Sequence, residues 1–156
     1  MKISDILEEK MVISNLPGNS KEEIINTLID VVSQSPKVLD KEKVRNAIFE
    51  REKIMSTGVG NGFAIPHGKT DAVTDIVAAF CVTQNPIPYQ SLDDKPVRLV
   101  FLLVGKDNLV GPHIKLLSRI SRLMNKEEFR NKLLATKTPK EIITTFVQEE
   151  ANYTEM

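Results

Sequence analysis

The first third of the chain carries apolar residues at the 3.6-residue period of an α-helix, and this pattern predicts two helices. Ser20 and Glu23 form a capping box that opens the first helix, and Pro36 ends it. Asp40 is a suitable N-cap for the second helix, which runs toward Arg51. The positions expected to face the core are Ile24, Ile25, Leu28, Val31 and Val32 in the first helix and Val44, Ala47 and Ile48 in the second.

Two later segments, 76–83 and 97–104, are nearly continuous apolar runs of strand length. Such runs are typical of central strands that helices cover on both faces. The proline-rich connection between them is expected to form loops or an edge segment, because proline cannot donate a hydrogen bond inside a sheet. Thr57 to Gly68 holds four glycines and one proline, which predicts a loop with a short strand at 63–65.

Three further helices are expected in the last third of the chain. The first begins near residue 112 or 113, and the second opens with Asn125 and Glu128. A capping box from Thr138 to Glu141 opens the third. Helices that alternate with apolar strands indicate an α/β fold in which helices cover a sheet. We expect one domain over residues 1–150, followed by a frayed tail at 151–156.

Composition narrows the classes of function. The 156 residues include 21 Lys plus Arg and 21 Asp plus Glu, so there is no basic field for nucleic acid. Cys81 is the single cysteine, which excludes an internal disulfide and a Cys-rich zinc site, and its apolar neighbours predict a small buried side chain. No apolar run is long enough to span a membrane, and the N-terminal segment lacks a signal-peptide pattern. We therefore expect a cytoplasmic protein.

Both histidines lie in segments rich in glycine and proline, which is where chemistry is expected. His67 follows Pro66 and precedes Gly68, so the ring is held in one place and another molecule can approach it closely. His113 follows Pro112 at the start of a helix, where the helix dipole disfavours imidazolium, and a neutral ring can act as nucleophile or hydrogen-bond donor. A turn histidine and an ordinary first-turn residue are the plainer interpretations.

Other candidate sites have weaker support. Arg51 could hold phosphate oxygens, or it could belong to a solvated charged face. The run GVGNG does not match the dinucleotide pattern, because the segment from Phe63 to Pro66 follows it in place of a helix. It does not match the Walker pattern either, because no Lys-Ser or Lys-Thr follows a suitable glycine. Asp71 and Asp75 could complete a metal site with the histidines only by assumption. A hydrolase triad fails because no serine lies on a nucleophile elbow.

The segment from Arg51 to Lys69, REKIMSTGVGNGFAIPHGK, resembles the active-site signature of the fructose/mannitol-type IIA domains of the bacterial phosphotransferase system. The most specific part is Ala64-Ile65-Pro66-His67-Gly68. The likeness extends over nearly the whole chain. The residues REKIMSTGVGNG are most similar to the stand-alone nitrogen-regulatory branch of the family.

This resemblance implies a mixed β-sheet covered by helices and a phosphocarrier that needs no cofactor and turns over no small molecule by itself. It implies that His67 is phosphorylated on Nε2, that His113 assists by donating to the phosphoryl group, and that Arg51 holds phosphoryl oxygens. The implied donor is an HPr-type histidine phosphocarrier, and the implied acceptors are a IIB sugar-transport component or regulatory protein targets. Phe63 is a candidate for an apolar rim around the site, and a buried core position is at least as good an alternative. A non-catalytic regulatory binding module of the same fold is the second hypothesis.

Overall fold

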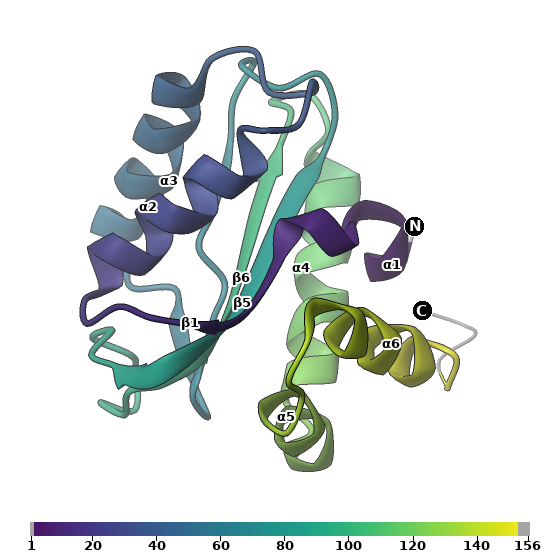
Figure 1. Ribbon diagram of the computed structural model, residues 1–156. Coiled ribbons are helices and arrows are strands. Elements are labelled where there is room, and N and C mark those ends of the chain that lie inside the picture. Colours follow the sequence, from purple (N-terminus) through teal and green to yellow (C-terminus); the bar gives the residue numbers. More distant parts are fainter. Residues whose placement is uncertain (1, 153–156) are drawn as a thin grey trace.

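The computed structural model describes residues 2–152, in which one β-sheet separates two layers of helices (Figure 1). Helices α2 and α3 cover one face, and α1, α4, α5 and α6 lie on the other. In chain order the elements are α1 (Ile3–Ile6), the short 3-10 helix η1 (Glu9–Met11), β1 (Val12–Leu16), α2 (Lys21–Val32), α3 (Lys41–Ile54), β2 (Gly58–Gly60), β3 (Phe63–Ala64), β4 (His67–Lys69), β5 (Val77–Ile87), β6 (Val97–Gly105), α4 (Val110–Met124), α5 (Glu127–Leu134) and α6 (Pro139–Glu150).

The sheet has six strands and mixed pairing. Its strands follow the order β1-β5-β6-β3-β2, and β4 pairs with β6 beyond the end of β3. Strands β5 and β6 are antiparallel, whereas β1 is parallel to β5, and β3 and β4 are both parallel to β6. The predicted α/β class, with a mixed sheet covered by helices on both faces, is confirmed.

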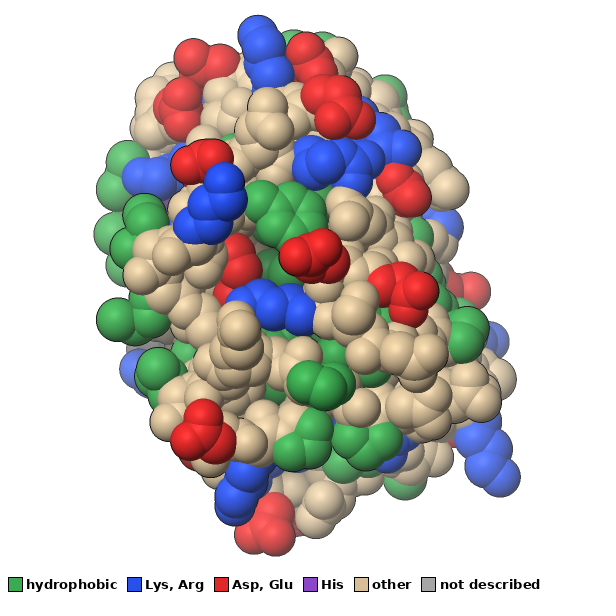
Figure 2. All heavy atoms as spheres, turned by 90° about the vertical axis from the view of Figure 1, so that its left-hand side faces the viewer, with side chains coloured by type: hydrophobic (Ala, Val, Ile, Leu, Met, Phe, Trp, Pro, Cys, Tyr) green, Lys and Arg blue, Asp and Glu red, His purple; other side chains and the backbone are tan. Residues whose placement is uncertain are grey.

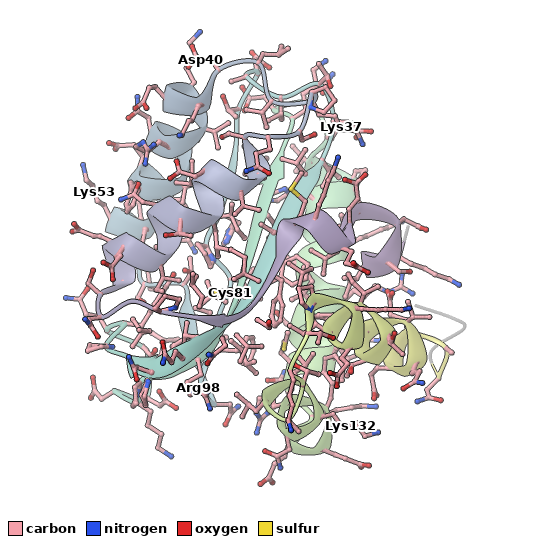
Figure 3. All side chains as sticks on the ribbon, in the orientation of Figure 1. Lys37, Asp40, Lys53, Cys81, Arg98 and Lys132 are labelled. Carbon is pink, nitrogen blue, oxygen red and sulfur yellow. The ribbon has the colours of Figure 1, made fainter. Side chains whose placement is uncertain are left out.

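Alternating side chains of β5 and β6 build two separate cores. Val77, Ala79 and Cys81 pack against α2 and α3 with the first core. The intervening Ala78 and Phe80 pack on the opposite side, with α4, α5 and α6. Because successive residues of a strand point to opposite faces, a run that is apolar at every position requires cover on both sides. Cys81 is fully buried, and Figure 3 shows it in the interior of the molecule.

Most predicted helix starts agree with the structure. Ser20 accepts a hydrogen bond from the Glu23 amide, and Asp40 accepts two from the first turn of α3. Thr138 likewise caps α6. The expected opening of α5 at Asn125 is wrong, because Asn125 is the C-cap of α4 and α5 begins after Lys126.

Other features also differ from the sequence-based expectation. Strand β1 was not expected; it pairs over a long sequence distance with β5, and a positive φ at Asn15 interrupts its regular pattern. The glycine segment is a tight hairpin of β2 and β3 rather than a loop with one strand. Helix α4 begins at Val110, two or three residues earlier than predicted.

The C-terminal helix is tied to the start of the chain. The Glu150 carboxylate accepts hydrogen bonds from the amides of Ile3 and Ser4, at 2.6 and 3.0 Å. Of the expected tail at 151–156, residues 153–156 lie outside the described part. None of the helices within residues 2–152 has the length and apolarity needed to cross a membrane.

Candidate active site

Strand β4 carries His67 at the edge of the mixed sheet. It pairs with β6 so that His67 lies beside Leu103 and Gly68 beside Val104. Gly68 faces α3, where an added Cβ would lie 3.1 Å from the backbone of Ala47. The strand alternation then directs His67 to the other face, toward α4. Gly68 therefore allows α3 to pack tightly behind the strand that carries His67.

The His67 ring is held in one tautomer by its own strand. Its Nδ1 lies 2.7 Å from the carbonyl oxygen of Ile65. A carbonyl only accepts hydrogen bonds, so Nδ1 carries the proton and Nε2 keeps its lone pair. Pro66 restricts Ile65 to extended backbone, which positions that carbonyl beside the ring. The sequence context therefore explains why Nε2 is the ring nitrogen that keeps a free lone pair.

His113 lies opposite His67, on the fourth residue of α4. The two ring centroids are 5.8 Å apart, with the ring planes at 50°. His113 is only 3% exposed, and neither ring nitrogen has a hydrogen-bond partner among the described residues. A Cβ added at Gly105 would lie 2.5 Å from its Nδ1, so the glycine at the end of β6 makes room for this ring. Sequence analysis missed this role of Gly105, because only the fold brings the two residues together.

Arg51 completes the group from the last turn of α3. It is half-buried, and its Nη1 donates to the carbonyl of Met55 at 2.9 Å. That contact holds the guanidinium at the start of the glycine segment, near enough to His67 for its charge to affect the ring. The structure thus brings together His67, His113 and Arg51, the three residues that sequence analysis singled out.

Both imidazoles have a pKa below the ordinary value of 6.5, which favours the neutral form at pH 7. Burial lowers the pKa of His67, with a smaller contribution from the Arg51 charge, while the Ile65 hydrogen bond and the Glu52 charge act in the opposite direction. Burial also lowers the pKa of His113, to about 4, and the neighbouring His67 and Lys69 add to this effect. A neutral ring is the form that can accept an electrophile at nitrogen.

The glycine segment is a hairpin whose turn is Asn61-Gly62. Both residues have positive φ, 58° and 79°, as a type I′ turn requires. The Asn61 amide donates to Asp93 at 3.0 Å, and the Gly62 carbonyl accepts from the amides of Arg98 and Leu99. The hairpin is therefore anchored to the segment before β6 and to β6 itself. The dipeptide Asn-Gly was the sequence signal for this turn.

Phe63 is not part of an apolar rim around the site. Phe63 is 2% exposed and belongs to the core, so its alternative assignment as a core residue is confirmed. Exposed apolar side chains instead follow Arg51 and flank His113 in the sequence; they are Ile54, Met55, Val59, Val110 and Ile114. Figure 2, which views the molecule from the side of α2 and α3, shows hydrophobic side chains along its left margin and lower half.

Asp71 and Asp75, the acidic candidates for a metal site, form no ligand cluster with the histidines in the described part of the chain. Within residues 2–152, no three His, Cys, Asp or Glu side chains gather closely enough to hold a metal ion. Asp75 instead accepts a hydrogen bond from the Ile76 amide and lies 3.9 Å from the Lys37 ammonium.

Comparisons with known proteins show which family the chain is similar to. The fructose-specific EIIABC component of Bacillus subtilis is 34% identical over 150 residues, which are 96% of this chain and 24% of that protein. This chain thus spans about a quarter of that relative. The nitrogen regulatory protein of Bradyrhizobium diazoefficiens is 33% identical over 137 residues, covering 88% of this chain and 89% of that protein.

A solved structure gives the same result for the fold. The nitrogen regulatory protein IIA-Ntr from Neisseria meningitidis superposes with a TM-score of 0.86 at 29% identity, covering 92% of this chain and 98% of the other. The sequence model of the family described as "Phosphoenolpyruvate-dependent sugar phosphotransferase system, EIIA 2" matches residues 5–149. The chain therefore belongs to the EIIA type 2 family of the phosphoenolpyruvate-dependent sugar phosphotransferase system.

Proposed function

We propose that this chain is a cytoplasmic phosphocarrier that accepts a phosphoryl group on Nε2 of His67 from an HPr-type histidine phosphocarrier. The observation that carries the proposal is the 2.7 Å hydrogen bond from Nδ1 of His67 to the Ile65 carbonyl. It leaves Nε2 as the nitrogen with a free lone pair, on a ring whose pKa is lowered by burial. Family membership supplies the class of reaction.

The transfer exchanges one nitrogen–phosphorus bond for another. The Nε2 lone pair of His67 attacks the phosphorus of the donor's phosphohistidine, and the donor imidazole leaves with the electron pair of its broken bond. The proton on Nδ1 of His67 stays in place, and the ring acquires positive charge. The Ile65 carbonyl, which accepts from Nδ1, stabilises that charge. Such transfers depend chiefly on positioning and on stabilising charge at the equatorial oxygens.

His113 and Arg51 are suited to the charge on the phosphoryl oxygens. His113 is neutral and buried, and its ring nitrogens have no partner among the described residues. The two ring centroids are 5.8 Å apart. A phosphoryl group on His67 would provide an acceptor for the N–H of His113. Arg51 would add a permanent positive charge. Together they offset the charge without a metal ion.

The exposed apolar rim suits a protein partner rather than a small molecule. Ile54 is 80% exposed, and Met55, Val59, Val110 and Ile114 are also exposed. A partner that covers these side chains would exclude water from the reacting atoms and bring its own reactive residue to His67. We expect the HPr-type donor and the acceptor to use this same rim in turn.

We consider two outlets for the phosphoryl group, each supported by the name of a relative. The EIIABC name of the Bacillus subtilis relative indicates transfer to a IIB component in sugar transport. The nitrogen regulatory relatives indicate a role in which phosphorylation changes the choice of protein partner. Phosphorylation adds about −1.5 to −2 charge near pH 7, and this chain has a formal net charge of zero. A non-catalytic binding module of the same fold is the alternative.

The test is intact mass after incubation with phosphoenolpyruvate, Enzyme I and an HPr-type carrier. We expect wild type to gain one acid-labile phosphoryl group and His67→Ala to gain none. His113→Ala should gain the group slowly but completely. A wild-type protein that is folded and gains no phosphoryl group from cognate donors would support the binding module instead.

A further inference from the structure

A buried carboxylate, Glu52, lies next to Arg51 and takes no part in the chemistry described above. The residue is 8% exposed. Its Oε2 accepts from the Thr57 amide at 2.8 Å, and its Oε1 accepts from the Thr57 hydroxyl. Glu52 thus binds both donors of one residue, five positions further along, where the chain leaves α3 and enters the glycine hairpin.

Two residues from distant segments complete the surroundings of Glu52. The Lys21 ammonium, at the start of α2, lies 2.8 Å from Oε2 of Glu52 and 4.5 Å from the centre of the Tyr89 ring. The Thr57 hydroxyl donates its proton to Glu52. The Tyr89 hydroxyl, 3.0 Å from the Thr57 hydroxyl, is therefore the donor in the hydrogen bond between the two. The buried charge is paired and its oxygens are hydrogen-bonded, as a buried carboxylate requires.

A continuous series of hydrogen bonds leads from this cluster to the reacting ring. Thr57 is fixed by Glu52 through its amide and hydroxyl, and the Thr57 carbonyl accepts from the Ile65 amide at 3.1 Å. The carbonyl of the same Ile65 accepts from Nδ1 of His67 at 2.7 Å. The Glu52 charge also acts on the His67 ring directly, raising its pKa.

We propose that Glu52 is a positioning residue for His67: through Thr57 and Ile65 it fixes the carbonyl that keeps the proton on Nδ1 and leaves Nε2 free. This inference rests on the proposed function of His67 and extends it to a residue that does not touch the phosphoryl group. Arg51, the neighbour of Glu52, donates to Met55 in the same connecting segment. Glu52 therefore sets the path of the chain between the guanidinium and the nucleophilic ring.

The helix α3 offers a matched control for Glu52. Glu50 has the same chemistry two residues earlier, but it is exposed, and among residues 2–152 it pairs with Lys53 alone, at 3.3 Å. Figure 3 shows Lys53 pointing outward from the molecule. Glu52→Gln and Glu50→Gln remove the same charge from the same helix and keep the side-chain size. A difference between them reports on the buried cluster.

Two readouts separate positioning from stability. The first is the tautomer of His67 from the imidazole ¹⁵N shifts, which are simple to assign because the chain has two histidines. The second is the initial rate of phosphorylation of the folded protein by a phosphorylated HPr-type donor. For Glu52→Gln we expect a detectable Nε2–H tautomer and a rate at least about tenfold lower, because small misplacement of a reacting group is costly. Glu50→Gln should match wild type in both.

A second pair of variants keeps the test decisive if Glu52→Gln does not fold. Thr57→Ser retains the hydroxyl and the amide, whereas Thr57→Val loses the hydroxyl. We expect Thr57→Ser to behave as wild type and Thr57→Val to be slowed with an altered tautomer population. Unchanged tautomer and rate in folded Glu52→Gln, or in Thr57→Val where the first variant is unfolded, would overturn the inference.

Failure of this inference is distinguishable from failure of the proposed function. If wild type takes up no phosphoryl group, the phosphocarrier function fails, while the tautomer measurement on unphosphorylated protein still reports whether Glu52 positions the ring. If wild type is phosphorylated and Glu52→Gln equals Glu50→Gln in both readouts, the function stands and the positioning role is wrong.

Discussion

At the scale of single residues, the two histidines are distinguished by what lies against each ring. His67 is half-buried and held by a backbone carbonyl, which selects Nε2 as the free nitrogen. His113 is nearly fully buried, and no described residue hydrogen-bonds its ring nitrogens. A buried polar group without a partner is costly to stability. Its persistence opposite His67 is explained if the phosphoryl group is its partner.

Burial of His113 has a consequence for acid stability. Its pKa is lowered to about 4 from the ordinary value of 6.5. Below pH 6.5 the unfolded chain therefore binds a proton that the folded chain does not, and unfolding becomes easier as the pH falls toward 4. From this residue we expect the free energy of unfolding to drop by about 3 kcal/mol between pH 7 and pH 4.

Urea unfolding of wild type and His113→Gln at several pH values measures this contribution. Carboxyl groups titrate over part of the same range, so the relevant quantity is the difference between the two proteins. The stability of His113→Gln relative to wild type should improve as the pH falls. Parallel pH profiles for the two proteins would contradict the assignment.

Gly105 is the residue whose side-chain absence makes room for the His113 ring. An added Cβ would lie 2.5 Å from Nδ1 of His113, so Gly105→Ala must displace the ring. We expect Gly105→Ala to lower the free energy of unfolding by about 1–3 kcal/mol, as at other overpacked sites, and to slow phosphorylation. Gly111→Ala is the control: it is a helical position with nothing within 4 Å of the added Cβ. There the change should be neutral or stabilising, and equal stabilities for the two variants would show that Gly105 has no such role.

At the scale of elements, the site depends on a short hairpin and a strand of three residues. The hairpin of β2 and β3 carries the glycine segment, and β4 carries His67. The strands of both elements are short, so each forms few backbone hydrogen bonds within the sheet and gains little stability from them. Tertiary anchors hold them instead: Asp93 and β6 for the hairpin, and β6 for β4.

The turn of this hairpin gives a test at the same scale. Gly62 has a φ of 79°, which costs an L-residue about 1–2 kcal/mol, so Gly62→Ala should lower the free energy of unfolding by that amount. Asn61→Gly should change it little, because Asn61 also has positive φ and glycine adopts that conformation readily. Chemical denaturation of the two variants checks the difference. A Gly62→Ala variant as stable as wild type would contradict the positive φ assigned to Gly62 in this turn.

These elements also show what could be predicted from the sequence. The long helices were predicted because apolar residues occupy nearly every core-facing position of their 3.6-residue period. Strands β5 and β6 were predicted because their apolar runs are nearly continuous. The strand β1 was missed since its apolar positions are few and its partner β5 lies more than 60 residues away. The hairpin was missed because four glycines suggested a loop, although Asn61-Gly62 is a turn signal.

At the scale of the whole molecule, two cores on one sheet bring distant site residues together. Arg51 comes from the layer of α2 and α3, His113 from the layer of α4, and His67 from the edge of the sheet between them. Sequence analysis named all three, through the resemblance and their unusual contexts. The contributions of Gly105 and Glu52 could not be named, because their contacts with His113, Lys21 and Tyr89 join segments far apart in the chain.

The central claim is that Nε2 of His67 is the atom that carries the phosphoryl group. The most direct measurement is NMR on ¹⁵N-histidine-labelled protein after phosphorylation by a cognate HPr-type donor, with ³¹P detection. Since the chain has two histidines, two imidazole spin systems are expected. The account predicts that the His67 Nε2 resonance shifts and couples to phosphorus, while Nδ1 of His67 stays protonated. Phosphorus coupled to Nδ1 of His67, or to either nitrogen of His113, would contradict it.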